Sequence, residues 1–150
     1  MFTVSGRIGD ICWPGAAAPE RRDGLWRHTC FEAFVRLPES SSYVELNYSP
    51  SGEWAAYRFR GYREAMESLD VPTPGIRTLA TETYVGIVTA IDLGGVEALS
   101  PKRPWLFNIS AVIEAKDGSR SHWALAHPSD VPDFHHPDCF VLELPPAGEP

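Results

Sequence analysis

Apolar and polar residues alternate with a period of two along several short stretches of the chain. The stretch FEAFVRL, residues 31–37, places Phe31, Ala33 and Val35 on one face of an extended segment. The stretch WLFNISAVIE, residues 105–114, repeats this alternation. Because successive side chains of a strand point to opposite faces, the pattern predicts strands that bury one face in a core.

The stretch YVELNYSPSGEWAAYRF, residues 43–59, contains two β-rich runs separated by the turn sequence SPSG. This arrangement predicts a β-hairpin. Pairing Tyr48 with Glu53 would leave Leu46 on the core face and gather polar and aromatic side chains on the opposite face. The side chains of that opposite face are Tyr43, Glu45, Asn47, Trp54 and Arg58.

The rest of the chain predicts further short elements. Strands are expected near residues 84–91, 122–125 and 139–144, and short helical turns near residues 63–69 and 92–99. Most strands follow one another without a helix of crossover length, which favours an antiparallel sandwich over a parallel βαβ sheet. The predicted fold class is therefore all-β, an antiparallel β-sandwich with one or two short helices.

Composition supports this prediction and limits the domain count. The chain has 150 residues, with 14 Pro and 12 Gly, which is typical of many short elements joined by turns. We predict a single domain over residues 1–144, followed by a disordered tail over residues 145–150. The three cysteines are scattered without a CxxC motif, so we expect buried free thiols rather than disulfides or a zinc site.

Charge and hydropathy exclude several classes of partner. The formal net charge is -7, with 13 Lys and Arg against 20 Asp and Glu, which argues against a nucleic-acid partner. The chain has no apolar stretch of about 20 residues, which argues against a membrane span. Its first residues, MFTVSGRIGD, lack the pattern of a secretory signal, so we predict a cytoplasmic location.

The polar face of the predicted sheet is the best candidate for chemistry. Trp26 lies just before the strand that carries Glu32, and an indole beside carboxylate, guanidinium and amide groups suits a sugar ring and its hydroxyls. The candidate ligand-binding residues are Trp26, Arg27, His28, Glu32, Glu45, Asn47, Trp54, Arg58 and Asn108. The alternative is an ordinary solvated pair of Glu45 with Arg58, and an indole of Trp54 that covers a sheet edge.

Catalytic and metal motifs are weak by comparison. The chain has no GxSxG elbow, no phosphate-binding GxxxxGK motif and no GxGxxG motif. Glu32 and Glu45 on neighbouring strands resemble the acid pair of a glycoside hydrolase in type, but nothing else in the sequence supports hydrolysis. The histidines of HPSDVPDFHHPDC, including His135, lack a metal-ligand spacing, and no acidic loop has the spacing of a calcium site. The sequence therefore predicts a non-catalytic protein and marks no metal-ligand residues.

Four segments, in this order, resemble a known family: GLWRHTCFEAFV, YVELNYSPSGEWAAYRFRGYR, NISAVIE and HWALAHPSDVPDFHHPDCFVLEL. They are similar to bacterial DOMON-like proteins related to family 9 carbohydrate-binding modules, the MurB-like DOMON group. The resemblance spans residues 21–144. It implies a sandwich of immunoglobulin-like jelly-roll architecture that binds a sugar or a haem and is not a hydrolase. It also implies ligand contacts from Trp26, Glu32 and Asn108, whose positions match those of the sugar-binding relatives.

The resemblance leaves two alternative functions open. Haem-binding relatives use Met and His as axial ligands, so Met66 with His28, His127 or His135 would make this a b-type haem domain for electron transfer. The third hypothesis is a structural or protein-interaction domain. Relatives usually have one or two strands before the segment that resembles FTVSGRIGDICWP, so we also expect that the chain lacks the family's first strands or begins downstream of its natural start.

Overall fold

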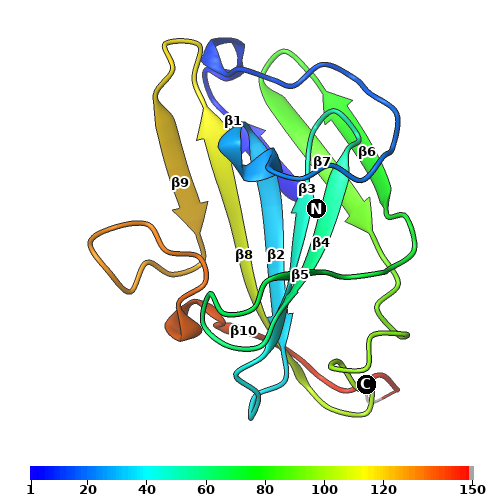
Figure 1. Ribbon diagram of the computed structural model, residues 1–150. Coiled ribbons are helices and arrows are strands. Elements are labelled where there is room, and N and C mark those ends of the chain that lie inside the picture. The colour runs from blue at the N-terminus through cyan, green and yellow to red at the C-terminus, as the bar shows by residue number, and fades with distance from the viewer. Residues whose placement is uncertain (149–150) are drawn as a thin grey trace.

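The structure, a computed structural model that describes residues 1–148, is built from strands and short 3-10 turns (Figure 1). The strands are β1 (Phe2–Ser5), β2 (Cys30–Arg36), β3 (Tyr43–Tyr48), β4 (Trp54–Phe59), β5 (Glu67–Ser68), β6 (Gly75–Ala80), β7 (Tyr84–Ala90), β8 (Trp105–Glu114), β9 (Arg120–Ala124) and β10 (Leu142–Leu144). The 3-10 turns are η1 (Ile8–Asp10), η2 (Leu25–Arg27) and η3 (Pro137–Cys139).

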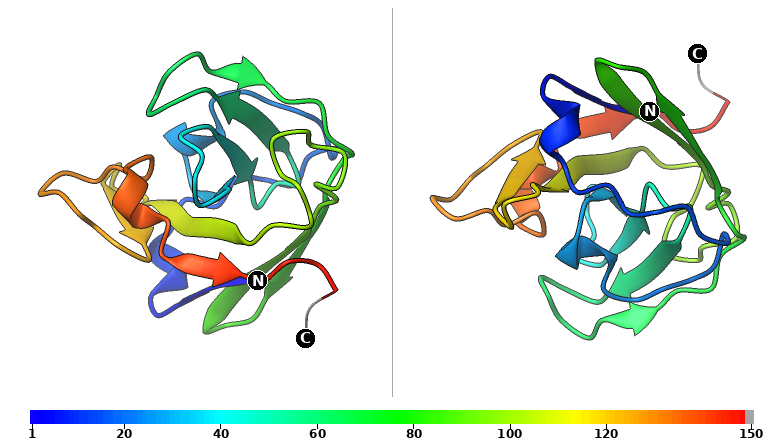
Figure 2. Two further views of the ribbon diagram at one scale, coloured as in Figure 1. Left: turned by 90° about the horizontal axis from the view of Figure 1, so that it is seen from below. Right: turned by 90° about the horizontal axis from the view of Figure 1, so that it is seen from above.

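The strands form two antiparallel sheets that pack in a sandwich-like arrangement, which confirms the predicted all-β class. The small sheet has the order β1-β7-β6, and the large sheet has the order β10-β8-β2-β3-β4-β5. β9 also pairs with β8, so β10 and β9 share one edge of that long strand. Seen from either end, the small sheet lies against one side of the large sheet (Figure 2).

The prediction of short helical segments at residues 63–69 and 92–99 is wrong, because residues 1–148 contain no α-helix. Arg63 and Ala65 have positive φ angles of 55° and 49°, which a right-handed helix does not allow. Residues 92–99 instead form successive turns, in which the amide of Gly94 donates to Asp92. We expect the glycines there to weaken a helix.

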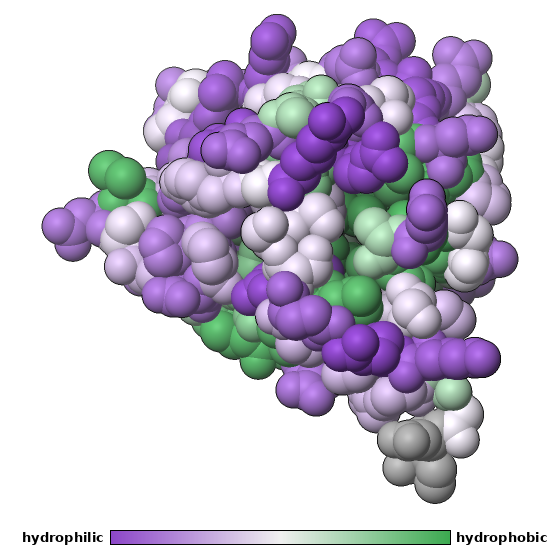
Figure 3. All heavy atoms as spheres, turned by 60° about the horizontal axis from the view of Figure 1, so that its bottom comes forward, coloured by the Kyte–Doolittle hydropathy of each residue, from purple (hydrophilic) through white to green (hydrophobic). Residues whose placement is uncertain are grey.

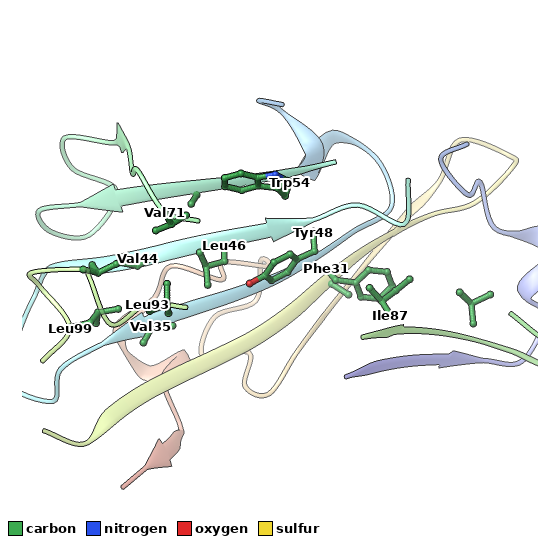
Figure 4. Packing of buried hydrophobic residues seen from close by; sticks show 14 residues of the cluster. Phe31, Val35, Val44, Leu46, Tyr48, Trp54, Val71, Ile87, Leu93 and Leu99 are labelled. Carbon is green, nitrogen blue, oxygen red and sulfur yellow. The ribbon is translucent and has the colours of Figure 1, made fainter. Parts of the chain in front are cut away.

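Both faces of the large sheet are buried, although the sequence pattern predicts only one. The face toward the small sheet carries the larger core, which includes Val35, Leu46 and Trp54 of the large sheet and Ile87 of β7, which lies beside Phe31 (Figure 4). The opposite face carries a second apolar cluster, which includes Phe34, Tyr57, Phe59, Phe134 and Phe140. A strand buried on both faces explains why all six residues of β3 are buried.

The predicted pairing of Tyr48 with Glu53 is wrong by one residue. The amide of Ser49 donates to the carbonyl of Glu53 at 2.9 Å, and Tyr48 pairs with Trp54, so the loop between the strands is one residue longer than predicted. Gly52, with φ +100°, supplies the left-handed position in this loop. As a result Trp54 moves to the core face, and Arg58 pairs with Val44 rather than lying beside Glu45.

One backbone hydrogen bond attaches the last described residues to the loop before β8. The amide of Ala147, within the predicted tail of residues 145–150, donates to the carbonyl of Pro101 at 2.9 Å. Residues 149–150 of that predicted tail lie outside the described residues. Within residues 1–148, every helical segment is far too short to cross a bilayer.

Candidate functional site

A cavity of about 380 Å³ lies on the face of the large sheet that points away from the small sheet. Strands β2 and β3 form its floor, and the loops after β4 and before η3 border it. These loops belong to the end of the molecule whose surface is mostly hydrophilic (Figure 3). The cavity is lined by Trp26, Glu32, Glu45, Phe59, Arg63, Met66, Val112, His122, Pro132, Phe134 and His135.

Strand register places two glutamates side by side on the cavity floor. Glu32 of β2 pairs with Asn47 of β3, and Phe34 of β2 pairs with Glu45. Strand alternation therefore directs Glu32, Glu45 and Asn47 to the same face. Glu32 is 3% exposed and Glu45 is 5% exposed, so both carboxyl groups are removed from bulk water.

The two carboxyl groups have few partners in the protein. The hydroxyl of Ser110 donates to Oε2 of Glu32 at 3.3 Å. The amide of Asn47 donates to Oε1 of Glu45 at 2.7 Å, and Cys30 Sγ donates to the amide oxygen of Asn47 at 3.8 Å. In the described part of the chain, Glu32 has no salt bridge, and the one such contact of Glu45 is with His135 Nε2 at 3.8 Å.

Burial changes the acidity of both groups. Desolvation raises the pKa of Glu32 from 4.5 to about 8, and the negative charge of Glu45 adds to the increase. Desolvation also raises the pKa of Glu45 to about 7, although the hydrogen bond from Asn47 opposes this. Glu45 ionises first, so Glu32 must lose its proton beside an existing charge. Near neutral pH we therefore expect the pair to retain at least one proton, which can be donated to a ligand.

His135 is the neutral neighbour of this pair. Its Nδ1 lies 2.7 Å from the hydroxyl of Tyr43. That hydroxyl also accepts from the amide of Arg63 at 3.2 Å, so its own hydrogen is available for Nδ1. The N–H of the ring is then on Nε2, facing Glu45. Burial and the charge of Arg63 lower the pKa of His135 to about 4, so the ring is uncharged at neutral pH.

An ion pair joins the two loops that border the cavity. Arg63, in the loop after β4, places Nη2 at 2.7 Å from Oδ1 of Asp133, in the loop before η3. The hydroxyl of Tyr62 donates to the other oxygen of Asp133. These contacts hold the pKa of Asp133 below its usual value, although desolvation acts in the opposite direction. The guanidinium of Arg63 is thus already neutralised within the protein.

Trp26 reaches the cavity from the turn η2. Gly24, with φ +78°, allows the chain to turn before η2, and Leu25 is buried. The indole of Trp26 packs edge-on against Tyr57, with ring centroids 5.9 Å apart. The hydroxyl of Tyr57 donates to Asp23 at 2.7 Å, so the turn is attached to the sheet on both sides.

The structure brings some of the predicted site residues together. Trp26, Glu32 and Glu45 line the same cavity, with Asn47 directly behind Glu45. Asn108 lies in the same sheet on β8, where it pairs with Phe34 and its amide donates to the carbonyl of Phe134 at 2.8 Å. Its amide oxygen is buried and has no hydrogen-bond partner among residues 1–148. Asn108 thus supports a wall of the cavity without lining it.

The other predicted site residues lie elsewhere. Arg27 and His28 border a separate hollow, where His28 contacts Glu114 at 2.8 Å. The one-residue change of register carries Trp54 into the core and turns Arg58 toward Glu67, with which it forms an ion pair. We conclude that these four side chains do not share the cavity of Glu32 and Glu45.

Several cavity residues were not assigned to the sugar site from the sequence. Arg63, His122 and Phe134 come from segments distant along the chain from Glu32 and Glu45. The sequence singles out Met66 as a candidate haem ligand and His135 as a candidate haem or metal ligand, but not as residues of a sugar site. The cluster of His and Asp at residues 133–136 stands out in the sequence, but no local pattern links that loop to β3.

Residues 1–148 hold no group of metal ligands, and two of the three cysteines are buried. Within residues 1–148, no group of three or more His, Cys, Asp and Glu side chains is arranged to hold a metal ion. Cys30 and Cys139 are buried free thiols, as predicted, whereas Cys12 is exposed, so that part of the prediction is wrong.

In comparisons with known proteins, no family model, curated protein or solved structure matches the chain.

Proposed function

We propose that this protein is a non-catalytic ligand-binding domain whose ligand is a carbohydrate or a sugar-containing metabolite. The observation that carries the proposal is the pair Glu32 and Glu45, buried side by side at the floor of a cavity that Trp26 borders. The resemblance to DOMON-like proteins and family 9 carbohydrate-binding modules supports the same conclusion.

The chemistry of the cavity suits a small hydroxylated ring. A carboxyl group that keeps its proton donates and accepts, and the carboxylate beside it accepts only, so together they can satisfy ring hydroxyls. The indole of Trp26 offers an apolar surface for the C–H face of a sugar. The volume of about 380 Å³ lies within the range of small-molecule sites, roughly 300–1,000 Å³.

Below neutral pH the acidity of the two glutamates favours binding over hydrolysis. A retaining glycosidase needs one protonated acid and one ionised nucleophile. Burial raises the pKa values of both Glu32 and Glu45, to about 8 and about 7, so below pH 7 both carboxyl groups are mostly protonated and the pair lacks an ionised nucleophile. We expect no release of nitrophenol from aryl glycosides.

Thermal unfolding with a panel of hexoses and disaccharides tests this function. A ligand at 100 times its dissociation constant stabilises the fold by about 2.7 kcal/mol, which should raise Tm by roughly 5–10 °C. Trp26→Ala should abolish the increase, and Trp123→Ala is the matched control because this exposed tryptophan lies outside the cavity. If no sugar in the panel raises Tm, the proposed function is wrong.

A b-type haem domain is the second candidate, because Met66 and His135 both line the cavity. To bind iron, however, His135 would have to release either the Tyr43 hydroxyl at Nδ1 or its position beside Glu45 at Nε2. A Soret band in a haem-supplemented sample that disappears in Met66→Ala and His135→Ala would favour this candidate over sugar binding.

A further inference from the structure

The charges around the cavity do not balance. Glu32, Glu45 and Asp133 are three acidic groups, whereas Arg63 is the one guanidinium among the lining residues. Asp133 neutralises Arg63 through a contact of 2.7 Å. Full ionisation therefore leaves two negative charges on the cavity floor. Burial disfavours such charges strongly unless a cation lies beside them.

Glu32 is the clearest sign of a missing cationic partner. Its side chain is 3% exposed, yet it lines the cavity, and the one hydrogen bond it receives from residues 1–148 is the 3.3 Å bond from Ser110. An ionised carboxylate has about four acceptor positions. Most of the accepting capacity of Glu32 is therefore directed into the cavity rather than used by the protein.

Aromatic rings stand around the same carboxyl groups. Trp26, Phe59 and Phe134 line the cavity, and His135 is an uncharged ring between Phe59 and Glu45. The face of an aromatic ring attracts a cation, most strongly for indole. A neutral sugar uses an apolar plate for stacking and can hydrogen-bond to the carboxyl groups, but it brings no charge to compensate two carboxylates. An ammonium group uses both features.

We propose that the ligand is an amino sugar, whose protonated amine lies between Glu32 and Glu45 and whose ring packs on Trp26. This inference rests on the proposed function and specifies its ligand class. An ammonium group has three donors, which matches the free acceptor positions of the two carboxylates, and its charge compensates the excess of negative charge on the cavity floor.

Binding of an amine should displace protons from the site. At pH 6.5 burial keeps both carboxyl groups largely protonated, with pKa values of about 8 for Glu32 and about 7 for Glu45. Pairing with an ammonium group favours their ionised forms, so binding should release about one to two protons. The other polar groups nearby are the Arg63–Asp133 pair, His135 and Tyr43, Ser110 of β8, His122 of β9 and Cys30 of β2. A neutral sugar that accepts from protonated carboxyls would release none.

Isothermal titration calorimetry at pH 6.5 with glucosamine, glucose and N-acetylglucosamine tests the inference. We expect glucosamine to bind at least 10-fold more tightly than the other two, with proton release visible as a dependence of the heat on buffer ionisation enthalpy. Glu32→Gln and Glu45→Gln should each remove most of this preference. Glu67→Gln is the control, because Glu67 is a half-exposed acid on β5 that pairs with Arg58 and Arg60 outside the cavity.

The outcomes separate the two proposals. Equal or tighter binding of glucose or N-acetylglucosamine would overturn the amine inference and leave the sugar-binding function intact. Absence of binding by all three probes and by the hexose panel would overturn both. Binding of calcium alone that Glu32→Gln abolishes would also overturn the amine inference, since a metal would then occupy the place of the ammonium group.

Discussion

The buried carboxyl of Glu32 should make the stability of this protein fall as the pH rises. Its pKa is 4.5 in an unfolded chain and about 8 in the folded protein, so the folded state binds the proton more tightly. The stability that this adds is fully present below pH 4.5 and is lost as the pH rises through 8. The full shift between the two pKa values corresponds to at most about 5 kcal/mol of unfolding free energy, at 1.36 kcal/mol for each pKa unit.

Glu32→Gln tests this reasoning with little change of shape. The amide oxygen of the substituted side chain can still accept from Ser110, and no proton is bound or lost. At pH 4 we expect the variant and the original protein to have the same free energy of unfolding within about 1 kcal/mol. At pH 9 the variant should be more stable by about 2–5 kcal/mol, because the original protein must bury an ionised group.

Urea unfolding followed by tryptophan fluorescence at each pH from 4 to 9 measures the difference. Glu67→Gln is a useful control, because hydrogen bonds from Arg58 and Arg60 lower the pKa of this exposed group. The stabilising contribution of Glu67 is therefore lost only as the pH falls below 4.5. Between pH 5 and 9 the difference in unfolding free energy between Glu67→Gln and the original protein should stay constant. A stability difference between Glu32→Gln and the original protein that does not change from pH 4 to 9 would refute the argument.

Three further predictions concern the surroundings of the cavity and the core. Burial lowers the pKa of His135 from 6.5 to about 4, so the stabilising contribution of the neutral ring should fall by up to about 3 kcal/mol as the pH falls from 6.5 to 4; urea titrations should show this as a change in the difference in unfolding free energy between the original protein and His135→Asn. Leu46→Ala should cost about 2–5 kcal/mol of unfolding free energy, because Leu46 is 2% exposed, whereas Leu142→Ala, at a site 40% exposed, should cost far less. Gly52→Ala should lower the unfolding free energy by about 1 kcal/mol, since φ +100° strains any residue with a Cβ; an unchanged Tm would contradict this.

Local sequence patterns were enough to predict the main strands. The alternation in residues 31–37 and 105–114 corresponds to β2 and β8, and the turn SPSG joins β3 to β4. The edge strands β1 and β6 were missed. β6 is largely exposed on both sides, so it lacks the alternation that marks a half-buried strand.

The register and the second buried face were decided by the tertiary structure. One additional residue in the loop between β3 and β4 moves every side chain of β4 to the opposite face, which sends Trp54 to the core and Arg58 to Glu67. The loop that carries Phe134 and His135 covers the face on which the sequence pattern places the candidate ligand-binding residues.

The sequence by itself determined that Trp26, Glu32 and Glu45 could share one face, because Glu32 and Glu45 alternate with apolar residues on predicted neighbouring strands. It did not determine that this face is a buried cavity. Arg63, Asp133 and His135 reach the cavity through contacts between loops far apart along the chain, such as the hydrogen bond between Tyr43 and His135. Residue periodicity reports which way a side chain points within its own strand, whereas the packing of distant loops sets its burial and its acidity.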